Sequence, residues 1–235
     1  MKKKSIQICV FILLIAVCIC GILFFYNLFL SKKTNIVLIS IDTCRADYLS
    51  CYGYKRSTTP NIDALAAEGI LFENTISPAP LTLPAHSSVL TGTIPPYHGA
   101  HDNTGHQLSK SNLTLAEILG ANGFKTDAII SAFVLDSQFG IAQGFDTYND
   151  EFEEEHLAVD ISERKGGETT RLALEWLEKQ KDEKSFLFLH YYDPHFDYVP
   201  PEPFASQFAD NPYAGEVAYT DHCIGQVLDK LKELG

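Results

Sequence analysis

Cysteine is scarce in this chain, and its placement excludes two classes of protein. Only six of the 235 residues are cysteines. Three lie in an apolar N-terminal stretch, and the three that follow are Cys44, Cys51 and Cys223. An odd number of cysteines without a zinc-type spacing indicates neither a disulfide framework nor a cysteine metal site.

Basic residues are also few once the N-terminus is set aside. Five of the 18 Lys and Arg residues, and none of the 30 acidic ones, lie in residues 1–33. The remaining chain therefore carries 13 basic against 30 acidic residues, a net charge of −17. Such a surface argues against nucleic acid and anionic lipid as partners.

The N-terminus has the pattern of a membrane anchor. Lys2–Lys4 precede Ile6–Leu30, an uncharged run long enough to cross a bilayer. The bulky residues Phe24–Phe29 near its end disfavour signal-peptide cleavage. We therefore predict that residues 1–33 are a cytoplasmic start and a single-pass transmembrane signal anchor, with residues 34–235 outside the cytoplasm.

The rest of the chain alternates between strand and helix patterns, with no internal repeat and no interdomain linker. Strands are predicted at 35–41, 69–76, 125–131 and 185–191, helices at 58–68, 84–90, 113–121, 168–179 and 216–234, and a solvated acidic loop at 145–155. This alternation predicts one α/β domain over residues 34–235.

The segment LTLPAHSSVLTG, residues 81–92, places a hydroxyl at a helix start. Thr82 stands two residues before Pro84, and proline is favoured in the first turn of a helix. There the unpaired N–H groups and the helix dipole favour an anion. Thr82 is either a helix cap or a nucleophile facing a sulfuryl or phosphoryl group.

Asp42 is a second candidate site residue and supplies a carboxylate. It directly follows the apolar run NIVLISI, and open α/β sheets bind ligands beyond the carboxyl ends of their strands. A carboxylate placed beside the Thr82 hydroxyl resembles a metal-assisted ester-cleaving site.

Five ordered motifs resemble the N-terminal part of the sulfatase family, in the alkaline-phosphatase-like superfamily. They are NIVLISIDTCRADYLSCYGY, TPNIDALAAEGILFENTIS, LTLPAHSSVLTG, YYDPHFDYVPP and YAGEVAYTDHCIGQVLDKLKELG. The resemblance covers residues 34–235 and implies a three-layer α/β/α sandwich with a mostly parallel central sheet. It also implies that the chain is truncated, since the family follows its last helix with a strand carrying further metal ligands.

Two departures from the family alter the expected chemistry. Thr82 stands where sulfatases carry the Cys or Ser that becomes formylglycine, and a threonine cannot form that aldehyde because its β-carbon bears a methyl group. A directly acting Thr82 resembles instead the phosphoesterase and phosphotransferase branches. His86 replaces an arginine and is expected to hold the anion with a weaker, pH-dependent charge.

The resemblance also assigns the metal and the remaining site residues. Asp42 and Thr82 are the expected ligands of a divalent ion (Ca, Mg, Mn or Zn), whereas Thr43 replaces a second aspartate. His195 is expected to protonate the leaving oxygen, and Asn103 to reach the sulfuryl or phosphoryl oxygens. Asp193 either orients His195 or turns the chain, and His190 reads as a core histidine of its strand.

Three functions remain open at this point. The first is a membrane-anchored, metal-dependent hydrolase of sulfate or phosphate esters. The second is a transferase that moves a phospho-headgroup onto an envelope glycan or lipid through the same Thr82 intermediate. The third is a non-catalytic fragment, because a metal held by one carboxylate and one hydroxyl is expected to support little turnover.

Overall fold

The computed structural model describes residues 15, 17–21, 34–152 and 163–235, and divides the chain into residues 1–34 and 35–235. In the first unit, residues 15 and 17–21 are helical. Within the described ranges, no helix combines the length and hydropathy needed to cross a bilayer. Most of the predicted anchor, Ile6–Leu30, lies outside the described residues.

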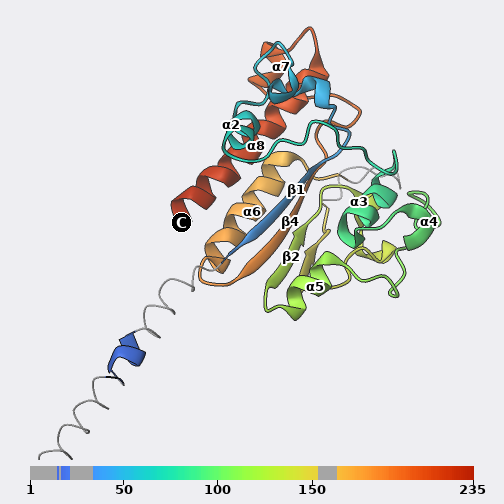
Figure 1. Ribbon diagram of the computed structural model, residues 1–235. Helices are drawn as coiled ribbons and strands as arrows, with labels where there is room; N and C mark the ends of the chain where they lie inside the picture. Colours follow the sequence, from blue (N-terminus) through green and yellow to red (C-terminus); the bar gives the residue numbers. More distant parts are fainter. Residues whose placement is uncertain (1–14, 16, 22–33, 153–162) are drawn as a thin grey trace, which may run out of the picture. The chain divides into compact units, whose positions relative to one another are not determined.

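The second unit is built on a parallel sheet with the strand order β1-β4-β2-β3 (Figure 1). The strands are β1 (Ile36–Ile41), β2 (Lys125–Ile129), β3 (Thr147–Asn149) and β4 (Ser185–Tyr191). Each strand is parallel to its neighbours. Every residue of β4 is buried, which explains why five of its seven residues are apolar or aromatic. The predicted α/β fold with a parallel sheet is confirmed.

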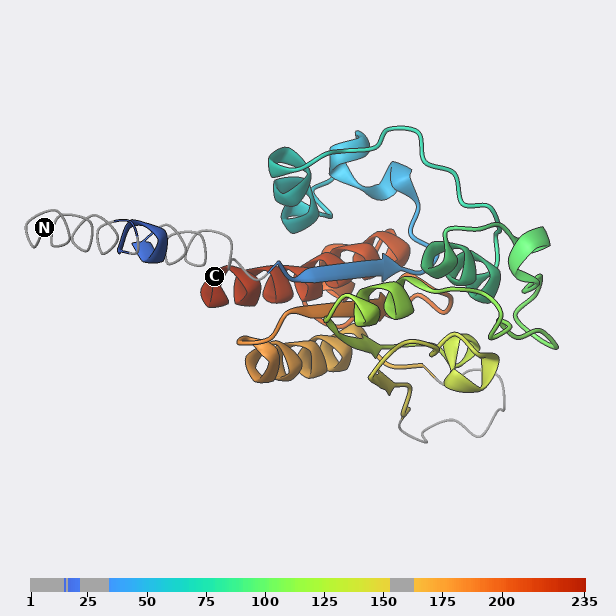
Figure 2. The same cartoon turned by 60° about the horizontal axis from the view of Figure 1, so that its bottom comes forward.

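Helices cover both faces of the sheet and make three layers (Figure 2). Helices α6 (Gly166–Gln180) and α8 (Pro212–Leu234) pack on one face, and α3 (Thr82–Thr91) and α5 (Leu115–Ala121) on the other. Successive side chains of β4 alternate between these layers: Phe186 and Phe188 join the α3 side, and Leu187 and Leu189 the α6 side. His190 follows in this alternation and therefore faces α3.

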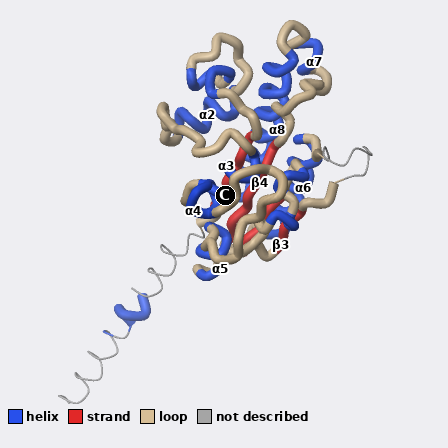
Figure 3. Tube along the Cα trace, turned by 90° about the vertical axis from the view of Figure 1, so that its right-hand side faces the viewer, coloured by secondary structure: helices blue, strands red, loops and turns tan. Residues whose placement is uncertain are grey.

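Shorter elements lie along the connections between the main helices and strands, and Figure 3 draws the loops of these connections in tan. The remaining α-helices are α2 (Pro60–Glu68), α4 (Pro95–His98) and α7 (Phe204–Gln207). Single 3-10 turns are η1 (Ala46–Tyr48), η2 (Ser50–Tyr52), η3 (Phe133–Leu135) and η4 (Ser137–Phe139). Helix α2 packs on α8, and α7 packs on the first part of α8.

Two sequence-based predictions are corrected here. The strand expected at 69–76 is an irregular segment, because it finds no pairing partner among the described residues and leaves Ile70 and Phe72 83% and 69% exposed. The acidic loop expected at 145–155 contains the edge strand β3, since Tyr148 is drawn inward and its hydroxyl donates to the Leu135 carbonyl at 2.6 Å. Helices α6 and α8 begin two and four residues earlier than expected.

Candidate active site

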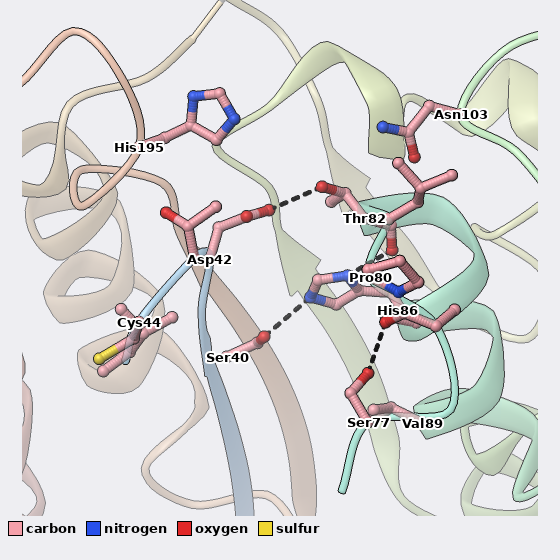
Figure 4. Close-up of a pocket in the computed structure, with 15 residues that line it drawn as sticks. Ser40, Asp42, Cys44, Ser77, Pro80, Thr82, His86, Val89, Asn103 and His195 are labelled. Atoms are coloured by element: carbon pink, nitrogen blue, oxygen red, sulfur yellow. Dashed lines mark hydrogen bonds between the residues drawn. The ribbon is translucent and has the colours of Figure 1, made fainter. Parts of the chain in front are cut away.

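The predicted meeting of Thr82 and Asp42 is present at the carboxyl end of β1 (Figure 4). Asp42 directly follows β1, and Thr82 is the first residue of α3. The Thr82 hydroxyl donates to Asp42 Oδ2 at 3.0 Å. Thr82 is not the N-cap of its helix, because Leu81 occupies that position. The side chain of Leu81 makes no capping hydrogen bond. The hydroxyl is therefore free to face the carboxylate.

Asn103 takes over the capping of α3. Its Oδ1 accepts a hydrogen bond from the Leu83 backbone N–H at 2.9 Å. This bond satisfies one of the donors that a helix start leaves open. The amide of Asn103 thereby comes to lie beside Thr82, as Figure 4 shows, at the position where the sequence predicted a contact with the transferred group.

The ring of His86 contacts both the backbone of Thr82 and the side chain of Ser40. Its Nδ1 lies 2.7 Å from the Thr82 carbonyl oxygen and its Nε2 lies 2.8 Å from Ser40 Oγ. Because a carbonyl only accepts, Nδ1 carries the proton and Nε2 accepts from Ser40. Burial, together with the nearby His190, lowers the pKa of His86 to about 4. The two bonds of the His86 ring fix the Thr82 backbone relative to Ser40, and the anion-holding role of His86 stays a prediction.

His190 is a site residue that its sequence position did not reveal. Its ring is completely buried in β4, as expected of a core histidine, yet Nε2 lies 3.3 Å from Asp42 Oδ2. Burial raises the pKa of Asp42, but contacts with His190, His86 and Thr82 outweigh it, so the pKa lies below its usual range. Asp42 is thus held as a carboxylate. The contact arises because β1 pairs with β4 and places Ser40 opposite His190, and no local sequence motif signals this pairing.

Asp42, Thr82, His86 and Asn103 line a hollow of about 420 Å³. His195, from the loop after β4, lines the same hollow as Asp42, Thr82 and Asn103. Its ring stacks on Tyr192 with the ring centres 4.3 Å apart, and its Nδ1 lies 3.0 Å from the Phe196 carbonyl oxygen. Since Nδ1 donates to that carbonyl, Nε2 is left to meet a substrate.

Asp193 does not contact the His195 ring but anchors the loop that carries it. The residue is buried, and its Oδ1 accepts from the Gly166 backbone N–H at 2.9 Å, at the start of α6. Burial raises the pKa of Asp193 to about 6. Of the two roles left open by the sequence, the structure supports the one in which Asp193 shapes the chain.

The described residues offer only part of a divalent metal site. Asp42 and Thr82 supply two oxygen donors that face the hollow. No group of three or more His, Cys, Asp or Glu side chains in the described ranges is arranged to hold an ion. Calcium takes six to eight oxygens, magnesium six, and zinc four ligands. The donors present are of suitable chemistry but too few.

The family model for sulfatases matches residues 34–235, which is the whole of the second unit with one residue before it. The chain belongs to the sulfatase family. Human arylsulfatase A is 38% identical to it over 105 residues, which are 43% of this chain and 21% of the relative. Mouse steryl-sulfatase is 35% identical over 108 residues, 42% of this chain and 17% of the relative.

Solved structures agree with this assignment. BT4656, in complex with its substrate D-glucosamine-2-N,6-O-disulfate, is 26% identical with a TM-score of 0.64, covering 76% of this chain and 38% of that one. A protein of the alkaline phosphatase superfamily from Vibrio parahaemolyticus gives 21% identity and a TM-score of 0.67, covering 86% of this chain and 51% of that one. The chain therefore spans about a fifth of the length of these curated relatives and 38% and 51% of these two structures.

Proposed function

We propose that this site cleaves sulfate esters with Thr82 as a direct nucleophile. The observation that carries the proposal is the bond from the Thr82 hydroxyl to the Asp42 carboxylate, at a helix start facing an open hollow. Membership of the sulfatase family favours a sulfate over a phosphate ester. The bound disulfated sugar of BT4656 supports sulfated carbohydrates as a substrate class, since that protein shares the fold.

In the proposed reaction, Thr82 Oγ1 attacks the ester sulfur while the bond from sulfur to the alcohol oxygen breaks. The Thr82 proton passes to Asp42, the group among the described residues that accepts its hydrogen bond. His195, in its protonated form, gives a proton to the departing alcohol oxygen. Water then attacks the Thr82 sulfate ester and releases sulfate, which restores the threonine hydroxyl.

We also propose that Asp42 and Thr82 are two ligands of a divalent ion, whose other ligands come from residues outside those described. An ion at this place would lower the pKa of the Thr82 hydroxyl, and such help is needed because Asp42, whose own pKa lies below its usual range, is a weak base. The identity of the ion (Ca, Mg, Mn or Zn) stays open. Formylglycine chemistry is excluded from the proposal because residue 82 is a threonine.

The anchor is a further part of the proposal. The uncharged run Ile6–Leu30 is long enough to hold the protein in a membrane as a single-pass anchor. Placing residues 34–235 outside the cytoplasm would give the site access to sulfated material beyond the cell.

The test measures release of sulfate and phosphate from 4-nitrophenyl esters by the full-length protein, with and without divalent salts. Thr82→Ala should abolish turnover, whereas Thr91→Ala, at the far end of the same helix, should leave it unchanged. Mass spectrometry of the protein quenched during turnover should find a sulfuryl group on Thr82. Full activity of Thr82→Ala would refute the assignment, and transfer to an added alcohol rather than to water would indicate the transferase.

A further inference from the structure

Thr43, the residue after Asp42, has a backbone conformation that threonine rarely adopts. Its φ is +48°, and it is the non-glycine residue with positive φ in the part of the chain that the structure describes. A β-branched residue in this left-handed region is strained, and such strain persists only where the surroundings impose it. Neighbouring groups must therefore hold Thr43 in this conformation.

Two hydrogen bonds hold Thr43 in this conformation. Its side-chain hydroxyl donates to the Pro194 carbonyl oxygen at 2.8 Å. Its own carbonyl oxygen accepts from the Tyr213 hydroxyl at 2.8 Å, and that hydroxyl in turn accepts from the Arg45 N–H at 2.8 Å. A residue in the first turn of α8 and a residue after β4 are thus both tied to Thr43, just after the end of β1.

The residue tied by the Thr43 hydroxyl directly precedes His195. On the other side of Pro194, Asp193 is held by the Gly166 N–H at 2.9 Å. The backbone that leads into His195 is therefore fixed at two consecutive residues. One of these two ties comes from the residue next to Asp42, so the same short stretch places the carboxylate and the leaving-group histidine.

We propose that Thr43 is a positioning residue that sets His195 relative to the Asp42–Thr82 pair. Its hydrogen is committed to Pro194, and its role is to join the two halves of the site rather than to replace the missing aspartate as a ligand. The inference rests on the proposed role of His195. A strained threonine is retained here because glycine, which adopts this φ freely, has no hydroxyl to make the tie.

Variants at this position separate the hydroxyl from the strain. Thr43→Val keeps the shape and the strain without the hydroxyl, Thr43→Ser keeps the hydroxyl, and Thr43→Gly removes both hydroxyl and strain. On an alkyl sulfate, Thr43→Val should lower kcat about tenfold with little change in KM, since small misplacements of catalytic groups are costly. Thr43→Ser should restore kcat. Thr43→Gly should unfold at a higher temperature than Thr43→Val and yet be equally slow.

Esters with different leaving groups show whether a substitution at Thr43 lowers the rate through His195. A departing alkyl alcohol needs a proton, whereas 4-nitrophenolate departs without one. The full-length Thr43→Val and His195→Ala proteins should both be slow on an alkyl sulfate and near normal on 4-nitrophenyl sulfate.

If His195→Ala is slow on the alkyl ester but Thr43→Val is not, the positioning role is refuted while the proposed function stands. Equal loss on both esters by Thr43→Val would also refute it, because the effect would then not pass through His195. A His195→Ala protein unimpaired on either ester would refute the role of His195 and this inference with it. Should Thr43→Val fail to fold, Thr43→Gly, which lacks the hydroxyl without the strain, gives the same readings.

Discussion

Glu216 offers a test of how burial near the site shifts the pKa of a carboxyl group. This α8 residue is 1% exposed, and its Oε1 accepts from the Val199 N–H at 2.8 Å, which holds the far end of the loop that carries His195. Burial, with a further contribution from Asp193, raises the pKa of Glu216 to about 7 against the partial offset of Lys165. Glu163 also faces it and adds to the rise. The fold therefore prefers the neutral acid.

Glu216→Gln keeps the acceptor oxygen and removes the titration. A carboxyl whose pKa rises on folding contributes stability below its unfolded pKa of 4.5, and this contribution is lost as the pH rises through the folded value of about 7. Because glutamine pays no such penalty, the variant should exceed the parent in free energy of unfolding by about 3 kcal/mol at pH 8 and by only about 1 kcal/mol at pH 5.

Urea unfolding followed by circular dichroism at both pH values measures this difference. Glu202→Gln is the matched control, since Glu202 is exposed nearby and bonds only to Ser206 among the described residues. The control should match the parent at both pH values. A Glu216→Gln protein whose advantage is the same at pH 5 and pH 8, or that is less stable than the parent at pH 8, would refute the reasoning.

Three further predictions follow from other contacts. Asp42→Ala should weaken divalent-metal binding measured by calorimetry, and unchanged affinity would contradict the ligand role. Gly166→Ala should lower the free energy of unfolding by about 1–3 kcal/mol, because a Cβ there would lie 2.7 Å from Asp193 Oδ2; a neutral effect would show that the loop yields. Protease added outside intact cells should digest the protein after Lys33, and protection would mean that the anchor has the opposite orientation.

The main layers were predictable because their signals are local. A largely apolar run such as 185–191 favours a buried parallel strand, and the structure places β4 at those residues. The start of α8 was placed four residues too late, although Asn211, which caps the helix through Ala214 N, and Pro212, its first residue, mark it. The edge strand β3 was missed because its three residues are polar or aromatic and depend on β2 for pairing.

Only those site residues were predictable whose position follows from the order of strands and helices along the chain. Asp42 and Thr82 were expected together because each stands at the end of an element on the ligand side of the sheet. The contact between Asp42 and His190 depends on strand order, which the sequence does not state. The role of His86 depends on a partner, Ser40, that lies 46 residues away and has no distinctive motif.

The capping of α3 by Asn103 has a consequence for how the site pulls in a charged substrate. In the first turn of α3, the Leu83 N–H is taken by Asn103 and Pro84 has no N–H, so among residues 82–84 only Thr82 keeps a backbone N–H for an incoming anion. This turn therefore binds a tetrahedral anion poorly by itself, and the surrounding chain is strongly acidic. Attraction of the substrate therefore falls to cations, so its affinity should rise with divalent salt and fall when monovalent salt screens those charges.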